Sequence, residues 1–574
     1  MRTPLVLILS LGYPLYLLLQ LWGLSSLCPY PDFLSWDGDL RFVTTLKFLK
    51  ALESFDGLGF LGLILDSPTW PVLRNLFSIP FFYAMGVKGE TEILLTYLSF
   101  FSLFPLSFFL FHSLRKKLSD AFLGVSLLTP LLFSSPPFLL YTSSPMLEVQ
   151  GSFFFLLSVF SFHRFLNFHF HKILPAALSI FLLYQTKYPY GYIFLFLIFL
   201  FLFYENPPEF IGFVKRGLKF LISDTLNRTA LIAMTLLIFL PRFLTFFKQG
   251  KSPRYLLFLT GLIGISILLK FVGKESRSEE RTRFETYQLV LKFFFLPVLV
   301  WTLSHPDRLG SSGGTISHVQ MEGFQVGVEI VRDWKYWIFF LKTLGMDVWF
   351  SPFLGWTISG IQILILIHGF LRKRVRSLAF VLSLFVWLSV LGLTFLTPNH
   401  QARHVYHLIP ALLVSSILGG MEFLSPYLVR VPIFIGIWIF SILSQPVLSL
   451  RPYLCFGGVI PIYGTPIFFE KNLSPMMQGK IFLFSKMPEE HLNHADTELV
   501  FARKAYEFGA EVEFSERKFL RNIDSFQKII SAGKVCGGEA EKEFLEKRVG
   551  KTLLSEMKIE SEEGCLESYH LIIY

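Results

Sequence analysis

The chain consists largely of apolar runs of about 20 residues, the length that an α-helix needs to cross the hydrocarbon core of a bilayer. The first run is LVLILSLGYPLYLLLQLWGL. The apolar part of a cleaved signal peptide is usually shorter, so we interpret this run as a retained first helix. Charged residues make up 16% of the chain, against about 25% in soluble domains. The sequence therefore predicts a polytopic integral membrane protein.

The expected fold class is an all-α membrane domain with about thirteen transmembrane helices, followed by a small C-terminal α/β domain. Reading spans of about 20 apolar residues places the helices near residues 5–27, 91–113, 121–142, 150–167, 173–186, 191–204, 229–247, 255–273, 287–303, 351–371, 377–396, 409–426 and 431–449. The two near 173–204 are short and hairpin-like.

The composition changes after residue 449. Apolar runs become shorter, and segments such as KIFLFSK and YHLIIY show strand-like patterns, with helix-like patterns between them. We therefore expect two domains, a transmembrane domain at 1–449 and a soluble α/β domain at 450–574.

Lysine and arginine predict the orientation of the helices. The basic loops at 115–117, 163–172, 274–283 and 372–376 all fall on one side of the membrane in this helix count, which the positive-inside rule makes the cytoplasm. The loop KQGKSPR at 248–254 falls on the other side and is counter-evidence. The same rule explains the net charge of +10, so we expect no nucleic-acid partner.

The opposite face carries the polar residues that have no evident role in topology. They lie in the first external loop at 28–90, in the turn with Glu148, in QTKYPYGY at 185–192, in TPNHQARHVYH at 397–407 and in the tail. A binding or catalytic site is therefore expected on the extracytoplasmic face.

The first external loop contains SWDGDLRF at 35–42, followed by an amphipathic pattern. Its apolar positions share one helix face and are Phe42, Leu46, Leu49 and Leu52. This pattern predicts a helix that lies on the membrane surface. The segment DSPTWPVLRNLFSIPFFYAMG then predicts a turn and a second apolar helix with one basic residue, Arg74.

This order of features resembles the first periplasmic loop of GT-C glycosyltransferases, in the group of protein O-mannosyltransferases and aminoarabinose transferases. TSSPMLEVQG resembles the family's second external turn with its acidic residue, QTKYPYGY its Lys followed by Gly, and TPNHQARHVYHLIP its late external loop. The resemblance covers residues 1–450 as topology. It implies transfer of a sugar from a polyprenyl-phosphate donor to a lipid, glycan or protein acceptor, without a metal ion or other cofactor.

The resemblance implies a catalytic carboxylate in the first loop, where it would deprotonate the acceptor. Asp37 is the first choice and Asp39 is close behind, because the family's acidic pair is followed by Tyr, whereas here Gly38 separates the two and Arg41 follows. The His that the family has before its Pro pair is also absent. The register of the base between Asp37 and Asp39 therefore stays open.

The leaving phosphate calls for cationic and hydrogen-bonding groups. Arg403 has the forked donors that fit phosphate, Lys187 supplies a point charge, and Tyr406 can hydrogen-bond donor or acceptor. The remaining candidates for contacts with substrate are Glu148, Trp36, Arg41, Trp70 and Arg74.

Each of these residues also has a structural interpretation. The acidic residues can pair with Arg41, and the cations can anchor helix ends at lipid headgroups. Glu148 can lie at the start of a helix because a negative charge there interacts favourably with the helix dipole. Their placement on one face favours function. The alternatives to a glycosyltransferase are a lipid-linked glycan polymerase or ligase, a transporter, and a noncatalytic membrane scaffold. A bacterial cytoplasmic membrane, with the tail outside, is the expected setting.

Overall fold

The computed structural model describes residues 2–25, 37–65, 70–115, 117–168, 172–223, 281–304, 334–396 and 400–423, isolated positions between them that include Ser67 and Arg308, and in the tail Tyr506 and five strands. The first part of the chain forms α1 (Arg2–Ser25), α2 (Asp37–Glu53), α3 (Gly57–Leu65), α4 (Leu73–Met85), α5 (Gly89–Arg115), α6 (Leu118–Phe133), α7 (Pro136–Thr142), α8 (Leu147–Phe168), α9 (Ile173–Thr186), α10 (Tyr188–Glu205) and α11 (Pro207–Ser223).

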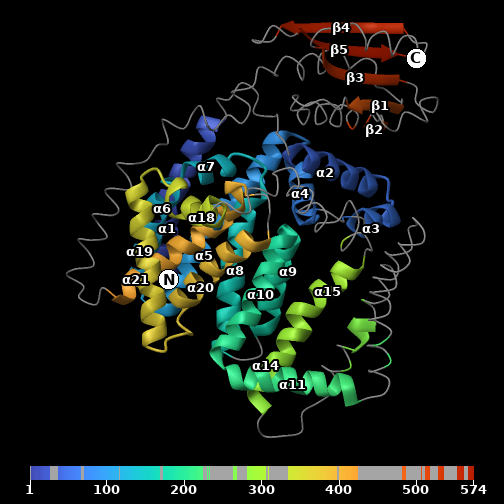
Figure 1. The fold of residues 1–574 in the computed structure, drawn as a ribbon. Helices are drawn as coiled ribbons and strands as arrows, with labels where there is room; N and C mark the ends of the chain where they lie inside the picture. The colour runs from blue at the N-terminus through green and yellow to red at the C-terminus, as the bar shows by residue number, and fades with distance from the viewer. Residues whose placement is uncertain are drawn as a thin grey trace.

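The second part continues the helical bundle (Figure 1). It forms α14 (Arg281–Val290), the π-helical turn η2 (Leu291–Phe295), α15 (Leu296–Leu303), α18 (Trp334–Lys342), the π-helical turn η4 (Thr343–Asp347), α19 (Pro352–Leu371), α20 (Leu378–Leu396), the 3-10 helix η5 (Ala402–Leu408) and α21 (Ile409–Phe423).

Eight helical spans among the described residues are long and apolar enough to cross a membrane, or nine if a bent pair counts as one. They correspond to expected helices, and α9, with 14 residues, is the short member predicted at 173–186. The expected helices at 229–247 and 431–449, and most of 255–273, lie outside the described residues. The total of thirteen therefore stays a prediction.

The helix expected at 121–142 is two helices. α6 and α7 meet at an angle of 91°, and Pro136 begins α7, where its fixed backbone angle suits a first helical position. The Ser135 hydroxyl donates to the carbonyl oxygen of Val348 at 2.7 Å, and the Phe350 amide donates to that of Ser134 at 2.9 Å. The hydropathy of this segment does not indicate the break. Contacts with the α18–α19 region stabilise it.

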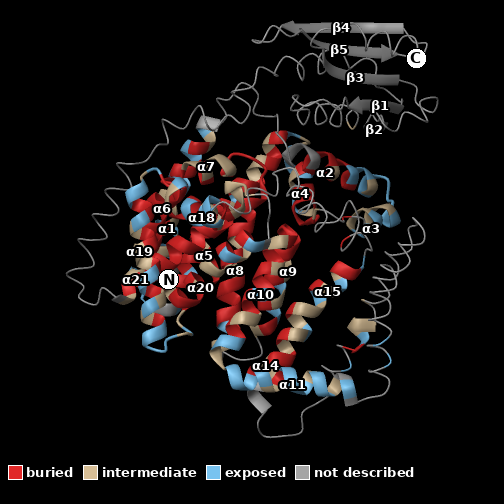
Figure 2. Cartoon of the chain, in the orientation of Figure 1, coloured by how far each residue is buried: buried red, intermediate tan, exposed pale blue. Residues whose placement is uncertain are grey.

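The centre of the bundle is buried (Figure 2), and large aromatic rings fill it. Phe100 of α5, for example, contacts Phe133 of α6 edge-to-face at 5.5 Å between centroids and Phe138 of α7 at 5.6 Å. All three are fully buried. Edge-to-face ring pairs add to the stabilisation from buried apolar area, so these rings hold the first loop's neighbours α5 to α7 in place.

The predicted amphipathic helix at the start of the first loop is α2. Its apolar face does not lie on the membrane: Phe42, Leu46 and Leu49 are buried against α4, which supplies Ile79 and Phe82. That part of the prediction is wrong because α4 provides a matching apolar face. Part of the exposed apolar surface of this loop lies on α3, where Leu58 is 85% exposed, and at the turn before it, where Phe55 is 95% exposed.

Two of the basic loops lie together at one end of the bundle. At one end, called here the basic end and defined by His163, Glu205 and Arg376, a ring nitrogen of His163 lies 2.9 Å from the carbonyl oxygen of Arg376, and Arg376 forms an ion pair with Glu205. The loops at 163–172 and 372–376 therefore share one end, as predicted. The starts of α5, α8 and α10 lie at the other end.

The tail forms a five-stranded sheet in the order β2-β1-β3-β5-β4. Its strands are β1 (Ile481–Lys486), β2 (Glu511–Glu516), β3 (Lys528–Val535), β4 (Thr552–Glu560) and β5 (Leu566–Ile573). β1 pairs in parallel with β2 and β3, and β5 pairs antiparallel with β3 and β4. The strand half of the expected α/β domain is present; its expected helices lie outside the described residues.

Candidate functional site

A buried ion pair marks the end of the bundle opposite the basic end. Lys187, between α9 and α10, approaches Glu148, in the first turn of α8, with 3.2 Å from Nζ to Oε1. Their side chains are only 11% and 3% exposed. Burying two charges costs several kcal/mol each unless they are paired and hydrogen-bonded, so this pair needs the neighbours described next.

A tyrosine and a histidine lie against the pair. The ring of Tyr190 stacks on that of His407 with 3.7 Å between centroids and 19° between planes, and Lys187 Nζ lies 5.2 Å from the Tyr190 centroid. A methyl group at Gly151 would come within 2.6 Å of the Tyr190 ring. The glycine on α8 therefore lets this ring approach the helix backbone.

The 3-10 helix η5 brings further polar residues to the same place. His404 interacts electrostatically with Lys187 and Arg403, and Tyr406 with Glu148. The Tyr406 ring packs edge-to-face on Tyr141, just after the α6–α7 break, at 5.1 Å. Because a 3-10 helix has three residues per turn, positions 403 and 406 lie one turn apart on the same side.

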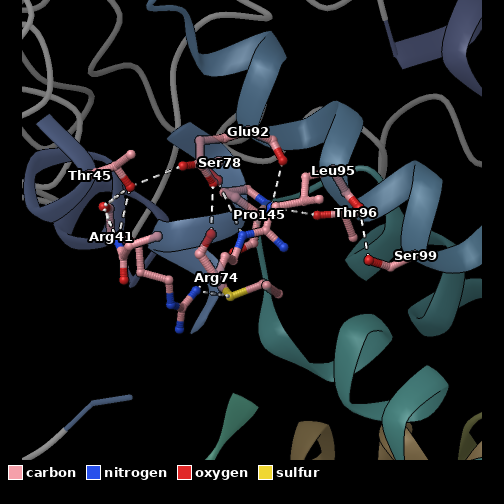
Figure 3. A network of polar contacts seen from close by, with 11 residues as sticks. Arg41, Thr45, Arg74, Ser78, Glu92, Leu95, Thr96, Ser99 and Pro145 are labelled. Carbon is pink, nitrogen blue, oxygen red and sulfur yellow. Dashed lines mark hydrogen bonds and ion pairs between the residues drawn. The ribbon is translucent and has the colours of Figure 1, made fainter. Parts of the chain in front are cut away.

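The first external loop reaches the site through Arg41 of α2. Its Nη1 donates to the carbonyl oxygen of Pro145 at 2.8 Å, three residues before Glu148, and lies 4.0 Å from the sulfur of Met146 (Figure 3). Arg41, Glu148 and Arg403 all interact electrostatically with Tyr190. Residues from the first loop, the second external turn, the α9–α10 turn and the late loop thus converge.

A second buried pair lies beside this cluster. Arg74 of α4 donates from Nε to Glu92 Oε2 of α5 at 3.2 Å and from Nη2 to Thr96 at 2.9 Å, as Figure 3 shows. Burial lowers the pKa of Arg74 from its usual value, and the carboxylate of Glu92 opposes that shift. Thr45 of α2 completes the network by donating to Glu92 Oε1 at 3.3 Å.

Several buried polar atoms of the cluster have no hydrogen-bond partner among the residues that the structure describes, among them Glu148 Oε2, the Tyr190 hydroxyl, His404 Nδ1 and His407 Nδ1. Buried polar groups in folded proteins are nearly always paired. These atoms need different partners, since a carboxylate oxygen needs a hydrogen-bond donor whereas a tyrosine hydroxyl can donate to an acceptor. A ligand that offers both a hydroxyl and an anionic oxygen meets both needs.

The structure thus brings together Arg41, Glu148, Lys187, Arg403 and Tyr406 of the predicted site residues. Arg74 lies close by in the Glu92 network. The remaining ones are described less fully: Asp37 and Asp39 form the first turn of α2, but their side chains lie outside the described residues, as does Trp36. Trp70 precedes α4 and is half-buried.

Sequence reasoning missed Tyr190, His407 and Gly151. The tyrosine and the histidine lie in segments that it did quote, YPYGY and RHVYH, but no pattern there distinguishes a stacked ring from an interfacial one. The sequence indicates no metal ligands, and in the described ranges no three His, Cys, Asp or Glu side chains are placed to hold a metal ion.

Arg308, also missed, ties the long loop after α15 to the first loop. It is 2% exposed and donates to the carbonyl oxygen of Leu65 at 2.6 Å and to Ser304 Oγ at 2.6 Å. Its guanidinium lies 4.5 Å from the Trp301 ring centroid. The first loop is therefore fastened at two points, through Arg41 in α2 and through Arg308 after α3.

No protein-family description matches this sequence, and no curated protein does. Among solved structures, the chain is similar to ArnT from Cupriavidus metallidurans bound to undecaprenyl phosphate, with a TM-score of 0.47, 9% identity and coverage of 98% of this chain and 97% of that one. The apo structure of the same protein matches with a TM-score of 0.44 and 9% identity, over 94% of this chain and 94% of that one. At these scores and identities the likeness is too distant to assign an activity to this chain.

Proposed function

We propose that this protein is a membrane glycosyltransferase that moves a sugar from a polyprenyl-phosphate donor to a lipid, glycan or protein acceptor on the extracytoplasmic face. The observation that supports it best is the buried cluster around Glu148 and Lys187, where an unpaired carboxylate oxygen can accept a hydrogen bond and an unpaired tyrosine hydroxyl can donate one. A sugar linked to phosphate offers a hydroxyl to the first and a phosphate oxygen to the second.

The cations of the cluster act on the phosphate. Arg403 and Lys187 stabilise the negative charge that develops on the leaving phosphate, in a buried place where such charges interact strongly. Tyr406 hydrogen-bonds the donor. Arg41 holds the first loop at Pro145 and adds its charge to the same cluster.

The base in this proposal is Asp37 or Asp39 of α2. Position 37 lies four residues before Arg41 and hence on the same face of the helix, which favours Asp37. The carboxylate takes the proton of the acceptor hydroxyl, the acceptor oxygen forms a bond to the anomeric carbon, and the bond from that carbon to the phosphate oxygen breaks. The electron pair stays on polyprenyl phosphate, and Glu148 orients the acceptor hydroxyl.

The test is transfer of label from radiolabelled polyprenyl-monophosphate sugars in membranes with matched amounts of wild type, Asp37→Asn, Asp39→Asn or Arg403→Ala protein. We expect transfer by wild type, a loss of at least a hundredfold in one Asp variant, as for removal of a general base, and a comparable loss in Arg403→Ala. Matched controls are Asp120→Asn and Arg164→Ala, near the basic end.

Two results would refute the proposal. The first is that wild type consumes no donor from a broad panel of sugars. The second is that every variant transfers as wild type does. Uptake of a solute into vesicles by wild type, with no label transferred, would instead favour a transporter. If wild type shows neither transfer nor uptake and the tail captures a defined partner, the result would favour a scaffold.

A further inference from the structure

Tyr190 differs from the other tyrosines of the α9–α10 hairpin. The hydroxyls of Tyr184 and Tyr192 lie 2.8 Å and 2.9 Å from Thr302 Oγ1, and that of Tyr188 donates to the carbonyl oxygen of Ser67 at 3.0 Å. Tyr190, at 2% exposed, is as buried as Tyr184 and Tyr188, whereas Tyr192 is half-buried. Its hydroxyl alone among the four has no partner in the described part of the chain.

The surroundings hold the Tyr190 ring where it is. One face stacks on His407, the Lys187 ammonium lies near the ring, and the helix backbone at Gly151 leaves no room for a side chain beneath it. A ring packed in this way cannot turn to find another partner at little cost. A buried tyrosine hydroxyl usually has one, so the orientation suits a group that this structure does not contain.

The charges around the hydroxyl indicate what that group is. Glu148 opposes negative charge at this point, and Arg403 and Arg41 favour it, so the two arginines offset the carboxylate. A phosphate oxygen only accepts hydrogen bonds, and a bond from a hydroxyl to a charged oxygen is stronger than one between neutral groups.

We propose that the Tyr190 hydroxyl donates a hydrogen bond to a phosphate oxygen of the polyprenyl phosphate. This inference rests on the function proposed above and adds a ligand-contacting residue to it. Tyr190 then works with Lys187, which holds the same phosphate as a point charge while it lies beside the ring.

The experiment measures binding of undecaprenyl monophosphate to the full-length protein in lipid nanodiscs, by quenching of tryptophan fluorescence. The variants are Tyr190→Phe, which removes only the hydroxyl, and Tyr192→Phe as a matched control whose hydroxyl bonds Thr302. Undecaprenol, which lacks the phosphate, shows how much of the binding comes from the lipid chain. Inorganic phosphate, added as a competitor, shows how much comes from the phosphate alone.

We expect Tyr190→Phe to weaken binding of undecaprenyl monophosphate about ten- to a hundredfold, the effect of one hydrogen bond to a charged group. Tyr192→Phe should bind as wild type does, and undecaprenol should bind wild type and Tyr190→Phe equally. Unchanged affinity in Tyr190→Phe overturns the inference and leaves the proposed function intact. Failure of wild type to bind any polyprenyl phosphate overturns both.

A second measurement applies if Tyr190→Phe does not fold. The full chain with 3-fluorotyrosine at position 190 alone reports on the hydroxyl through its ¹⁹F resonance. Addition of undecaprenyl monophosphate should shift that resonance, and addition of undecaprenol should not. A resonance that responds to neither lipid, in protein that binds the phosphate, overturns the inference.

Discussion

Glu92 and Glu148 are both buried carboxylates near the same end of the bundle, yet their oxygens differ in what they contact. Both oxygens of Glu92 accept hydrogen bonds, from Thr45 and from Arg74. Glu148 uses one oxygen for Lys187, and the other lacks a partner within the described residues. A carboxylate satisfied by the protein stabilises the fold, whereas one left half-satisfied suits a ligand.

The Arg74–Glu92 pair should therefore contribute to stability. Arg74→Met leaves the carboxylate of Glu92 buried without its cation, which costs about 3 kcal/mol. Thermal unfolding in detergent should show a clearly lower midpoint for this variant. Lys342→Met breaks an exposed pair with Asp347, whose side chains are 57% and 48% exposed. This variant should have the same unfolding midpoint as wild type. Equal midpoints for Arg74→Met and wild type would contradict this.

Gly151 permits the stack of Tyr190 on His407. Gly151→Ala places a methyl group about where the Tyr190 ring lies, at 2.6 Å, and so displaces the ring. A shift of this kind in a positioned group lowers the rate about tenfold or more. Label transfer per folded protein should fall by that factor, and the unfolding midpoint should fall as well, because overpacking a core costs about 1–3 kcal/mol. Gly212→Ala, with open space around it, is the control and should transfer normally.

At the scale of elements, the site depends on connections rather than on single helices. The turn between α9 and α10, the start of α8 and η5 are short segments that become neighbours only because long helices place them at one end. Tyr188 and Arg308 then join the first loop to α10 and α15 through Ser67.

Arg308 is the element-scale test of this arrangement. Arg308→Gln removes most of the donors that hold Leu65 and Ser67, so the amides after α3 should exchange hydrogen about ten times faster or more, as a region of lower local stability does. Mass spectrometry of the peptide that spans residues 57–75 measures this. Arg376→Gln, at the basic end, should leave that peptide unchanged; equal exchange in all three proteins would contradict the connection.

The sequence predicts the helices well and the site in part, for a physical reason. Apolar runs of spanning length identify α1, α5, α8 and α20, and the positive-inside rule separates the two ends, which is why Glu148, Lys187 and Arg403 are expected on one face. Close packing leaves no such periodic signal. The α6–α7 break and the Tyr190 ring depend on contacts with residues more than 200 positions away, which no local pattern reports.

At the scale of the whole molecule, the two ends should face different compartments. In protein without its native cysteines, Phe55→Cys lies at a fully exposed turn of the first loop, where Phe55 is 95% exposed, and Lys373→Cys lies at the basic end. A membrane-impermeant maleimide should label position 55 in intact cells and position 373 only after permeabilisation. The reverse pattern would place the site in the cytoplasm.

The lengths of the helices beside the site have a consequence for the surrounding lipid. α6 has 16 residues and α9 has 14, and at about 1.5 Å per residue they are roughly 24 Å and 21 Å long. The hydrocarbon core is about 30 Å thick. Such a mismatch is relieved by thinning of the bilayer. The membrane surface next to Lys187 should therefore lie closer to the bilayer midplane, and a lipid phosphate group there would lie deeper with it.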